Sequence, residues 1–171
     1  QRFVQSLLED IEGFHFYIYS PELVDTDKGR LHLRKTNHDG FKHDLASASG
    51  VISNSGFELI SECLHLGLQI LTRPQAAQME QQSNAAALEQ LGYATTTSAL
   101  TTNIIRQWLN TIQPVDPITY PDVAAAIVDW IADWNADGLV DNDKRPLSQL
   151  GAQLWQATLN HRTHRPIEQA P

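Results

Sequence analysis

The sequence predicts a three-layer α/β fold, in which a parallel sheet is covered by helices on both faces. Short apolar segments typical of strands alternate with amphipathic helical segments as far as about residue 97. The connections between these segments are short, and such alternation is typical of parallel sheets. From residue 98 onward the apolar residues recur at helical spacing. We therefore expect residues 1–97 to form the core and residues 98–171 to form a helical extension of the same domain.

Local patterns predict each element of the core in turn. Apolar residues at helical spacing open the chain, and an aromatic-rich run ended by Ser20 and Pro21 follows as a strand. The helices are expected over residues 1–11, 41–48, 57–66 and 78–91, and the strands over residues 14–19, 31–34, 51–53 and 68–71. Gly67 and Gly92 follow the last two helices, where a C-cap favours glycine. In the extension, apolar stripes predict helices over residues 100–112, 123–134 and 147–155.

The composition excludes several classes of protein. The chain of 171 residues has room for one domain with a substantial core. Its net charge is −8, from 12 basic and 20 acidic residues, so a nucleic-acid partner is not expected. Cys63 is the single cysteine, which excludes an internal disulfide and a multi-cysteine zinc site. Since no apolar run approaches the roughly 20 residues of a membrane-spanning helix, no transmembrane segment is expected.

The segment from residue 50 to residue 92 contains the pattern that most clearly indicates a binding site. A short apolar strand ends at Asn54, a turn follows at Ser55 and Gly56, and a helix begins at Phe57. In an open α/β sheet this turn lies at the carboxyl edge of the strands, where the N–H groups and dipole of a helix suit a diphosphate. Gly56 lets the backbone approach an anion closely. The alternative is a turn that serves packing alone.

Further carboxylates and amides follow at positions that suit a sugar and a ribose. Glu62 lies six residues after Gly56 and can accept hydrogen bonds from a ribose diol. Glu80 and Gln81 open the next helix at the same edge, where they can bind the hydroxyls of a neutral sugar. A solvated helical glutamate and ordinary polarity at a helix N-terminus are the alternatives.

Taken together, the segment resembles the C-terminal, donor-binding domain of GT-B fold glycosyltransferases. The resemblance rests on the spacing of Asn54, Gly56 and Glu62, and on the later run of Glu80 and Gln81 followed by Asn84. Its details are closest to an uncharacterised prokaryotic subgroup. It implies a Rossmann-like fold and a nucleotide-diphosphate sugar, UDP-linked, as substrate, with no further cofactor. It also implies a cytoplasmic protein, or one peripheral to the inner membrane when full-length.

The resemblance assigns a role to each candidate site residue. Nucleotide-binding residues are Phe41, Lys42, Asn54, Ser55, Gly56, Phe57 and Glu62, and donor-sugar-binding residues are Glu80, Gln81 and Asn84. The first two would hold the base in the loop that enters the helix at residues 41–48. Many relatives place Asn and Ser after the motif glycine, where this chain has Glu58 and Leu59. Phosphate binding is then expected to depend on backbone N–H groups and Ser55, against the like charge of Glu58.

The resemblance further implies that the active site is shared with a second domain. In inverting members the catalytic base lies on an N-terminal acceptor domain, so no catalytic residue is expected in these 171 residues, and no activity from them alone. A first strand is expected before the opening helix, and the sheet edge left open without it predicts a homodimer of the chain. Asn84 is expected to support the corner where the sugar binds.

Two other functions stay open at this point. One is a sugar-nucleotide epimerase of the same fold. The other is a non-catalytic interaction module that binds calcium through Asp133, Asn135, Asp137 and Asp141, which match the opening of an EF-hand loop. The closing position of that loop is Lys144, a cation, so we expect no metal there. The histidines show no ligand pattern in the sequence.

Overall fold

A computed structural model describes residues 2–136, 149–152, 154 and 156 of the chain. The chain divides into two compact units, residues 1–118 and residues 119–171. The helices of the first unit are α1 (Arg2–Leu8), α2 (His38–Ser47), α3 (Phe57–Leu66), α4 (Met79–Gln90) and α5 (Thr102–Leu109). Its strands are β1 (Phe16–Ser20), β2 (Thr26–Lys28), β3 (Leu31–Lys35), β4 (Gly50–Ser53), β5 (Gln69–Thr72) and β6 (Thr95–Thr96).

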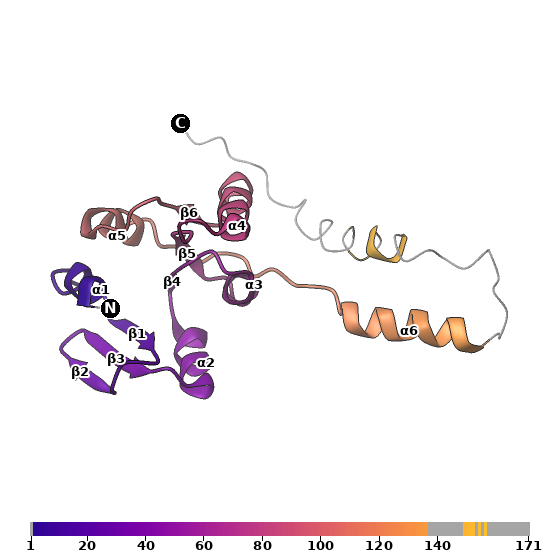
Figure 1. Ribbon diagram of the computed structural model, residues 1–171, viewed down its shortest axis with the longest axis horizontal. Coiled ribbons are helices and arrows are strands. Elements are labelled where there is room, and N and C mark those ends of the chain that lie inside the picture. Colours follow the sequence, from indigo (N-terminus) through magenta and orange to yellow (C-terminus); the bar gives the residue numbers. More distant parts are fainter. Residues whose placement is uncertain (1, 137–148, 153, 155, 157–171) are drawn as a thin grey trace. The chain divides into compact units, whose positions relative to one another are not determined.

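The strands of the first unit pair into two three-stranded sheets (Figure 1). One has the order β4-β5-β6, and all of its pairs are parallel. The other has the order β1-β3-β2, in which β1 and β3 are parallel while β2 runs antiparallel to β3. The predicted α/β class with a parallel, Rossmann-like sheet is confirmed. Strands β2 and β6 were not predicted, because they are only three and two residues long and show no alternation of apolar and polar residues.

Strand β5 lies between two hydrophobic clusters. Each cluster packs helices against one face of the strand, and this gives the fold its layers. Leu71 packs into a cluster with residues of α1, β3 and α5. Ile70, which points to the opposite face, packs into a cluster with residues of α2, α3 and α4. Both side chains are at most 1% exposed. Helix α5, placed by prediction in the extension, therefore contributes to the core of the first unit, and the domain boundary at residue 97 stays a prediction.

Capping residues account for where the helices begin and end. Helix α3 has the predicted bounds, and it ends at Gly67 with the left-handed φ of +70° that the C-cap prediction implied. Helix α2 begins three residues before its predicted start because the side chain of Asn37 accepts a hydrogen bond from the Gly40 N–H. The predicted helix over residues 1–11 ends at Leu8.

The second unit contains helix α6 (Val123–Ala136), which covers the predicted helix at residues 123–134. It exposes four large apolar side chains, Val123, Ile127, Val128 and Ile131. Residues 149–152, 154 and 156 have helical backbone, whereas Leu147 and Trp155 of the last predicted helix lie outside the described residues. Among the described residues, no helix is both long and apolar enough to span a membrane.

Two left-handed glycines provide a matched test of the packing at the end of α3. A Cβ on Gly67 would lie 2.4 Å from the Val115 carbonyl oxygen, whereas a Cβ on Gly92, at φ +69°, meets no atom within 4 Å. We expect Gly92→Ala to lower the free energy of unfolding by about 1–2 kcal/mol, the cost of the left-handed backbone. Gly67→Ala should cost distinctly more in the same urea titration. If the two variants lost the same free energy of unfolding, the packing of Val115 against this cap would be contradicted.

Candidate functional site

The turn between β4 and α3 places a helix N-terminus beside an open pocket. The Asn54 side chain accepts a hydrogen bond of 3.2 Å from the Gly56 N–H, which closes the turn. Gly56 is the N-cap residue of α3, and no side chain of the described residues caps the helix. The first N–H groups of an α-helix have no acceptor within the helix. Those of α3 therefore carry the positive end of its dipole toward this pocket.

Buried hydrogen bonds hold this turn against β5 and α4. The Oγ atom of Ser55, which is fully buried, lies 2.9 Å from Oγ1 of Thr72. Since the Thr72 hydroxyl donates to the Ser53 carbonyl oxygen at 3.1 Å, the Ser55 hydroxyl is the donor between the two. Asn84 donates to the Ser55 carbonyl oxygen at 3.1 Å, which ties α4 to the turn.

The burial of Ser55 corrects one expectation. Its hydroxyl was expected to contact a phosphate, but it is 0% exposed and bonded to Thr72. An anion at this turn would therefore meet backbone N–H groups and not the Ser55 hydroxyl. Thr72 is the residue that sequence reasoning missed, although a hydroxyl at the carboxyl end of an apolar strand beside a polar turn was a usable signal.

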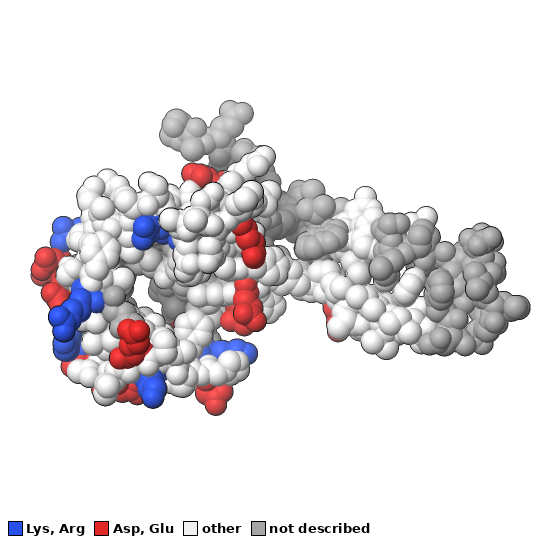
Figure 2. All heavy atoms as spheres, viewed as in Figure 1, with Lys and Arg blue, Asp and Glu red and all other residues white. Residues whose placement is uncertain are grey.

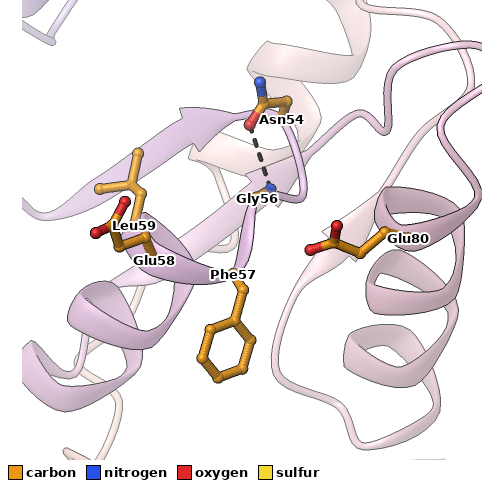
Figure 3. A pocket seen from close by; sticks show the side chains of 6 residues that line it. All are labelled: Asn54, Gly56, Phe57, Glu58, Leu59 and Glu80. Carbon is orange, nitrogen blue, oxygen red and sulfur yellow. Dashed lines mark hydrogen bonds between the residues drawn. The ribbon is translucent and has the colours of Figure 1, made fainter.

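The pocket has a volume of about 550 Å³ and lies where α3 and α4 begin (Figure 3). It is lined by Asn54, Gly56, Phe57, Glu58, Leu59 and Glu80. The Glu80 carboxylate points from the first turn of α4 toward the Gly56 turn (Figure 3). The charged side chains of this lining are both glutamates. Over the wider face in Figure 2, basic and acidic side chains of the described residues are interspersed.

The predicted sugar-binding residues divide into one that lines the pocket and two that do not. Glu80 is exposed at the pocket. Gln81 is only 9% exposed, and its Oε1 accepts a hydrogen bond of 2.9 Å from the Gln75 N–H. That contact braces the loop between β5 and α4. Gln81 and Asn84 thus position the two walls of the pocket rather than line it.

The structure places the predicted base-binding pair in a different environment from the one expected. Phe41 and Lys42 lie inside α2 and not in a loop, because Asn37 caps the helix earlier. The Phe41 ring packs edge-on against Tyr19, with ring centroids 5.1 Å apart. The Tyr19 hydroxyl donates to Asp44 at 2.6 Å, and burial followed by this bond raises the pKa of Tyr19 to about 12. Lys42 is exposed, and neither member of the pair lines the pocket.

Glu62 lies one helical turn after Glu58 and so shares its face of α3, half-buried. Its neighbour Cys63 is fully buried in the cluster formed with α2 and α4. Burial, with a smaller effect of the Glu62 charge, raises the pKa of the Cys63 thiol to about 12. The thiol therefore stays protonated near neutral pH and is not a nucleophile.

The calcium-loop residues fall mostly outside what the structure describes. Asp133 and Asn135 have helical backbone at the end of α6, and Asp137 and Asp141 lie outside the described residues. Within the described part of the chain, no group of three or more His, Cys, Asp or Glu side chains can hold a metal ion.

The buried hydroxyl pair is testable by stability. Thr72→Val keeps the side-chain shape but leaves the Ser55 hydroxyl without its acceptor. It also removes one of two hydrogen bonds to the Ser53 carbonyl oxygen, which keeps the bond from the Arg73 N–H. We expect the free energy of unfolding in urea to fall by about 1–3 kcal/mol. Thr96→Val on β6 is the matched control, because the half-buried Thr96 side chain makes no hydrogen bond within the described residues. A Thr72 variant as mild as this control would contradict the hydroxyl network.

Comparison with known proteins adds one finding to this geometry. No curated protein and no solved structure matches the chain. The family model described as Glycosyl transferase family 1 matches residues 2–113, which include strands β1 to β6 and helices α1 to α5. This match covers well over half of the 171 residues and the whole turn and pocket described above. The chain therefore belongs to glycosyl transferase family 1.

Proposed function

We propose that this chain binds the nucleotide-diphosphate sugar of a glycosyl transfer reaction, as the donor-binding, C-terminal half of a GT-B fold enzyme. One observation carries the proposal. The N-terminus of α3, without a side-chain cap, begins at the Gly56 turn beside the pocket, with the Glu80 carboxylate on the opposite wall. Family membership supports the reaction class.

The pocket, and Glu62 on α3, which does not line it, then have separate roles toward the donor. The N–H groups at the start of α3 bind the diphosphate oxygens, which need several donors and positive potential. Glu62, one turn further along α3, accepts hydrogen bonds from the ribose hydroxyls. Glu80 accepts hydrogen bonds from the sugar hydroxyls. UDP is the proposed carrier, and the catalytic base belongs to the acceptor-binding half, so the chain alone holds the donor without transferring it.

The charge of the pocket opposes this ligand and predicts weak binding. Glu58 lies in the first turn of α3 and lines the pocket, so its carboxylate lies on the same side as the proposed diphosphate. Two like charges that approach at a solvent-exposed site repel by an amount that salt reduces. The α3 amides must therefore bind the diphosphate against the charges of Glu58 and Glu80.

Two substitutions on one face of α3 should change UDP affinity in opposite directions. Glu58→Gln removes a repelling charge, so UDP should bind more tightly, and this gain should shrink as salt is raised. Glu62→Ala removes a hydrogen-bond acceptor, so the affinity should fall by roughly 2- to 10-fold for each bond lost. Isothermal titration calorimetry with UDP measures both.

Glu89→Ala, on the exposed last turn of α4, is the matched control for charge alone and should leave the affinity unchanged. If neither UDP nor another nucleoside diphosphate binds at millimolar concentration, the donor-binding proposal is wrong. If UDP binds and Glu89→Ala weakens it as much as Glu62→Ala does, the site lies elsewhere on the chain.

A further inference from the structure

Phe57, the first residue of α3, is an aromatic side chain that the fold leaves open to the donor pocket. It lines the pocket and is 71% exposed, more than any other Phe, Tyr or Trp residue that the structure describes. Within the described residues, no other aromatic ring and no cation contacts it. A ligand that covers an exposed ring removes a large apolar surface from water. The ring is therefore available for a contact with the donor.

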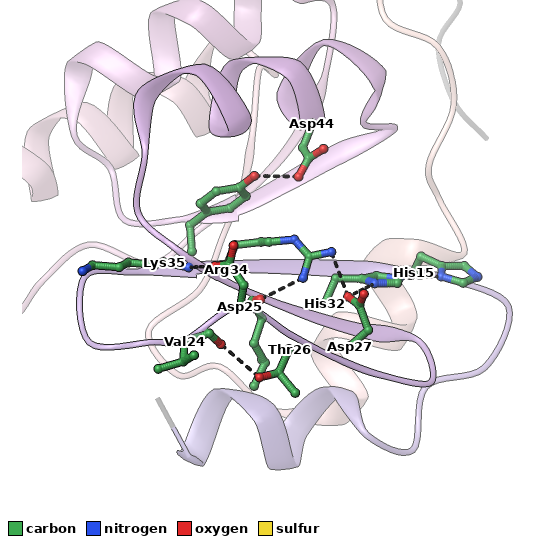
Figure 4. Close-up of polar contacts among 11 residues, drawn as sticks. His15, Val24, Asp25, Thr26, Asp27, His32, Arg34, Lys35 and Asp44 are labelled. Atoms are coloured by element: carbon green, nitrogen blue, oxygen red, sulfur yellow. Dashed lines mark hydrogen bonds and ion pairs between the residues drawn. The ribbon is translucent and has the colours of Figure 1, made fainter.

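The exposed aromatic ring on the sheet β1-β3-β2, by contrast, already has partners within the chain. Tyr17 on β1 is 49% exposed, but its ring stacks on His32 with centroids 4.5 Å apart, and the Arg34 guanidinium lies 5.8 Å from its centroid. Nδ1 of His32 lies 2.8 Å from a carboxylate oxygen of Asp27, and its Nε2 lies 2.9 Å from Nδ1 of His15 (Figure 4). These polar and aromatic side chains contact one another, whereas the ring at the start of α3 faces the pocket.

The pocket wall formed by α4 carries a negative charge that no basic side chain of the lining offsets. Figure 3 shows the Phe57 ring on α3 and the Glu80 carboxylate on α4 at the same pocket. Glu58 also lines the pocket, but its carboxylate points away from Glu80 (Figure 3). Arg73, directly after β5, does not line the pocket, and its Nε–H donates to the Ser98 carbonyl oxygen at 3.2 Å. A group bound here therefore meets an apolar ring on α3 and a charged hydrogen-bond acceptor on α4.

A neutral sugar has both of the surfaces that such a pair recognises. The C–H groups of a pyranose ring are apolar and slightly positive, so they pack on the negative face of an aromatic ring. The hydroxyls around its edge donate hydrogen bonds to a carboxylate. In the donor the sugar is joined to the diphosphate, for which the start of α3 is the proposed site, and Phe57 is the first residue of that helix.

We propose that Phe57 is the platform on which the donor sugar packs, and that Glu80 selects a sugar that carries no carboxylate. This inference rests on the donor-binding function proposed above and adds the class of sugar to it. A uronate, with a carboxylate in place of the primary alcohol, would bring a second negative charge toward Glu80 and would lose a hydrogen-bond donor. Two like charges about 5 Å apart in such an open pocket weaken binding by roughly 4- to 20-fold.

The test of selection compares UDP-glucose with UDP-glucuronate, which differ only in the group at C6, by isothermal titration calorimetry of the full chain. UDP-glucose should bind roughly 4- to 20-fold more tightly at low salt, and salt should reduce this ratio. Glu80→Gln keeps the shape of the side chain and removes its charge, so the ratio should fall close to one. Glu58→Gln should tighten both ligands together and keep their ratio. Glu89→Gln, on the exposed last turn of α4, is the matched control and should change neither affinity.

The test of the platform compares UDP-glucose with UDP, which lacks the donor sugar. Phe57→Ala should weaken UDP-glucose by roughly 2- to 10-fold and leave the affinity for UDP unchanged. Phe57→Trp keeps an aromatic face and should retain the affinity for UDP-glucose. Phe3→Ala is the matched control, because it removes another exposed ring, 60% exposed on α1, away from the pocket lining.

The outcomes separate this inference from the function on which it rests. If UDP does not bind at millimolar concentration, the donor-binding function is wrong and this inference is overturned with it. If UDP binds but UDP-glucuronate binds as tightly as UDP-glucose, selection by Glu80 alone is overturned. The platform is overturned if Phe57→Ala weakens UDP-glucose no more than Phe3→Ala does, or weakens UDP to the same extent as UDP-glucose.

Discussion

The burial of β5 on both faces is the constraint on which the rest of the first unit depends. Its four residues end with Ile70, Leu71 and Thr72, all at most 1% exposed. Alternate side chains point to opposite faces, so helices must cover the strand on both sides. Burial of Thr72 also means that its hydroxyl needs partners, and these are the Ser53 carbonyl oxygen and the Ser55 hydroxyl of the β4–α3 turn. The same strand that builds the core therefore positions the start of α3.

The candidate donor site combines a rigid backbone with an acidic lining. Its turn is tied to β5 through Ser55 and to α4 through Asn84, so the start of α3 is held in place before a ligand arrives. Such preorganisation favours binding because little conformational freedom is lost when the ligand arrives. The glutamates of the lining have the opposite effect on an anion. The affinity of this site for an anion thus depends on two opposing effects. The fixed backbone amides favour binding, and the glutamate charges oppose it.

Sequence patterns predicted the helices and the longer strands well, and individual side chains less well. The bounds of α3 and the left-handed cap at Gly67 followed from local spacing and were confirmed. Ser55 and Phe41 were misjudged for a shared reason. A motif indicates which residue types stand near a site, but only packing determines whether a given side chain turns toward the ligand or into the core.

The sequence by itself determined the alternation of strands and helices, the turn at Gly56 and the acidic character of the chain, because these depend on local periodicity and composition. The tertiary structure alone decided which distant polar groups meet. Asp27, His32 and His15 come together through the pairing of β2, β3 and β1, and β2 has no apolar alternation to reveal it. Register is set by which faces are buried across a whole sheet. No local pattern contains that information.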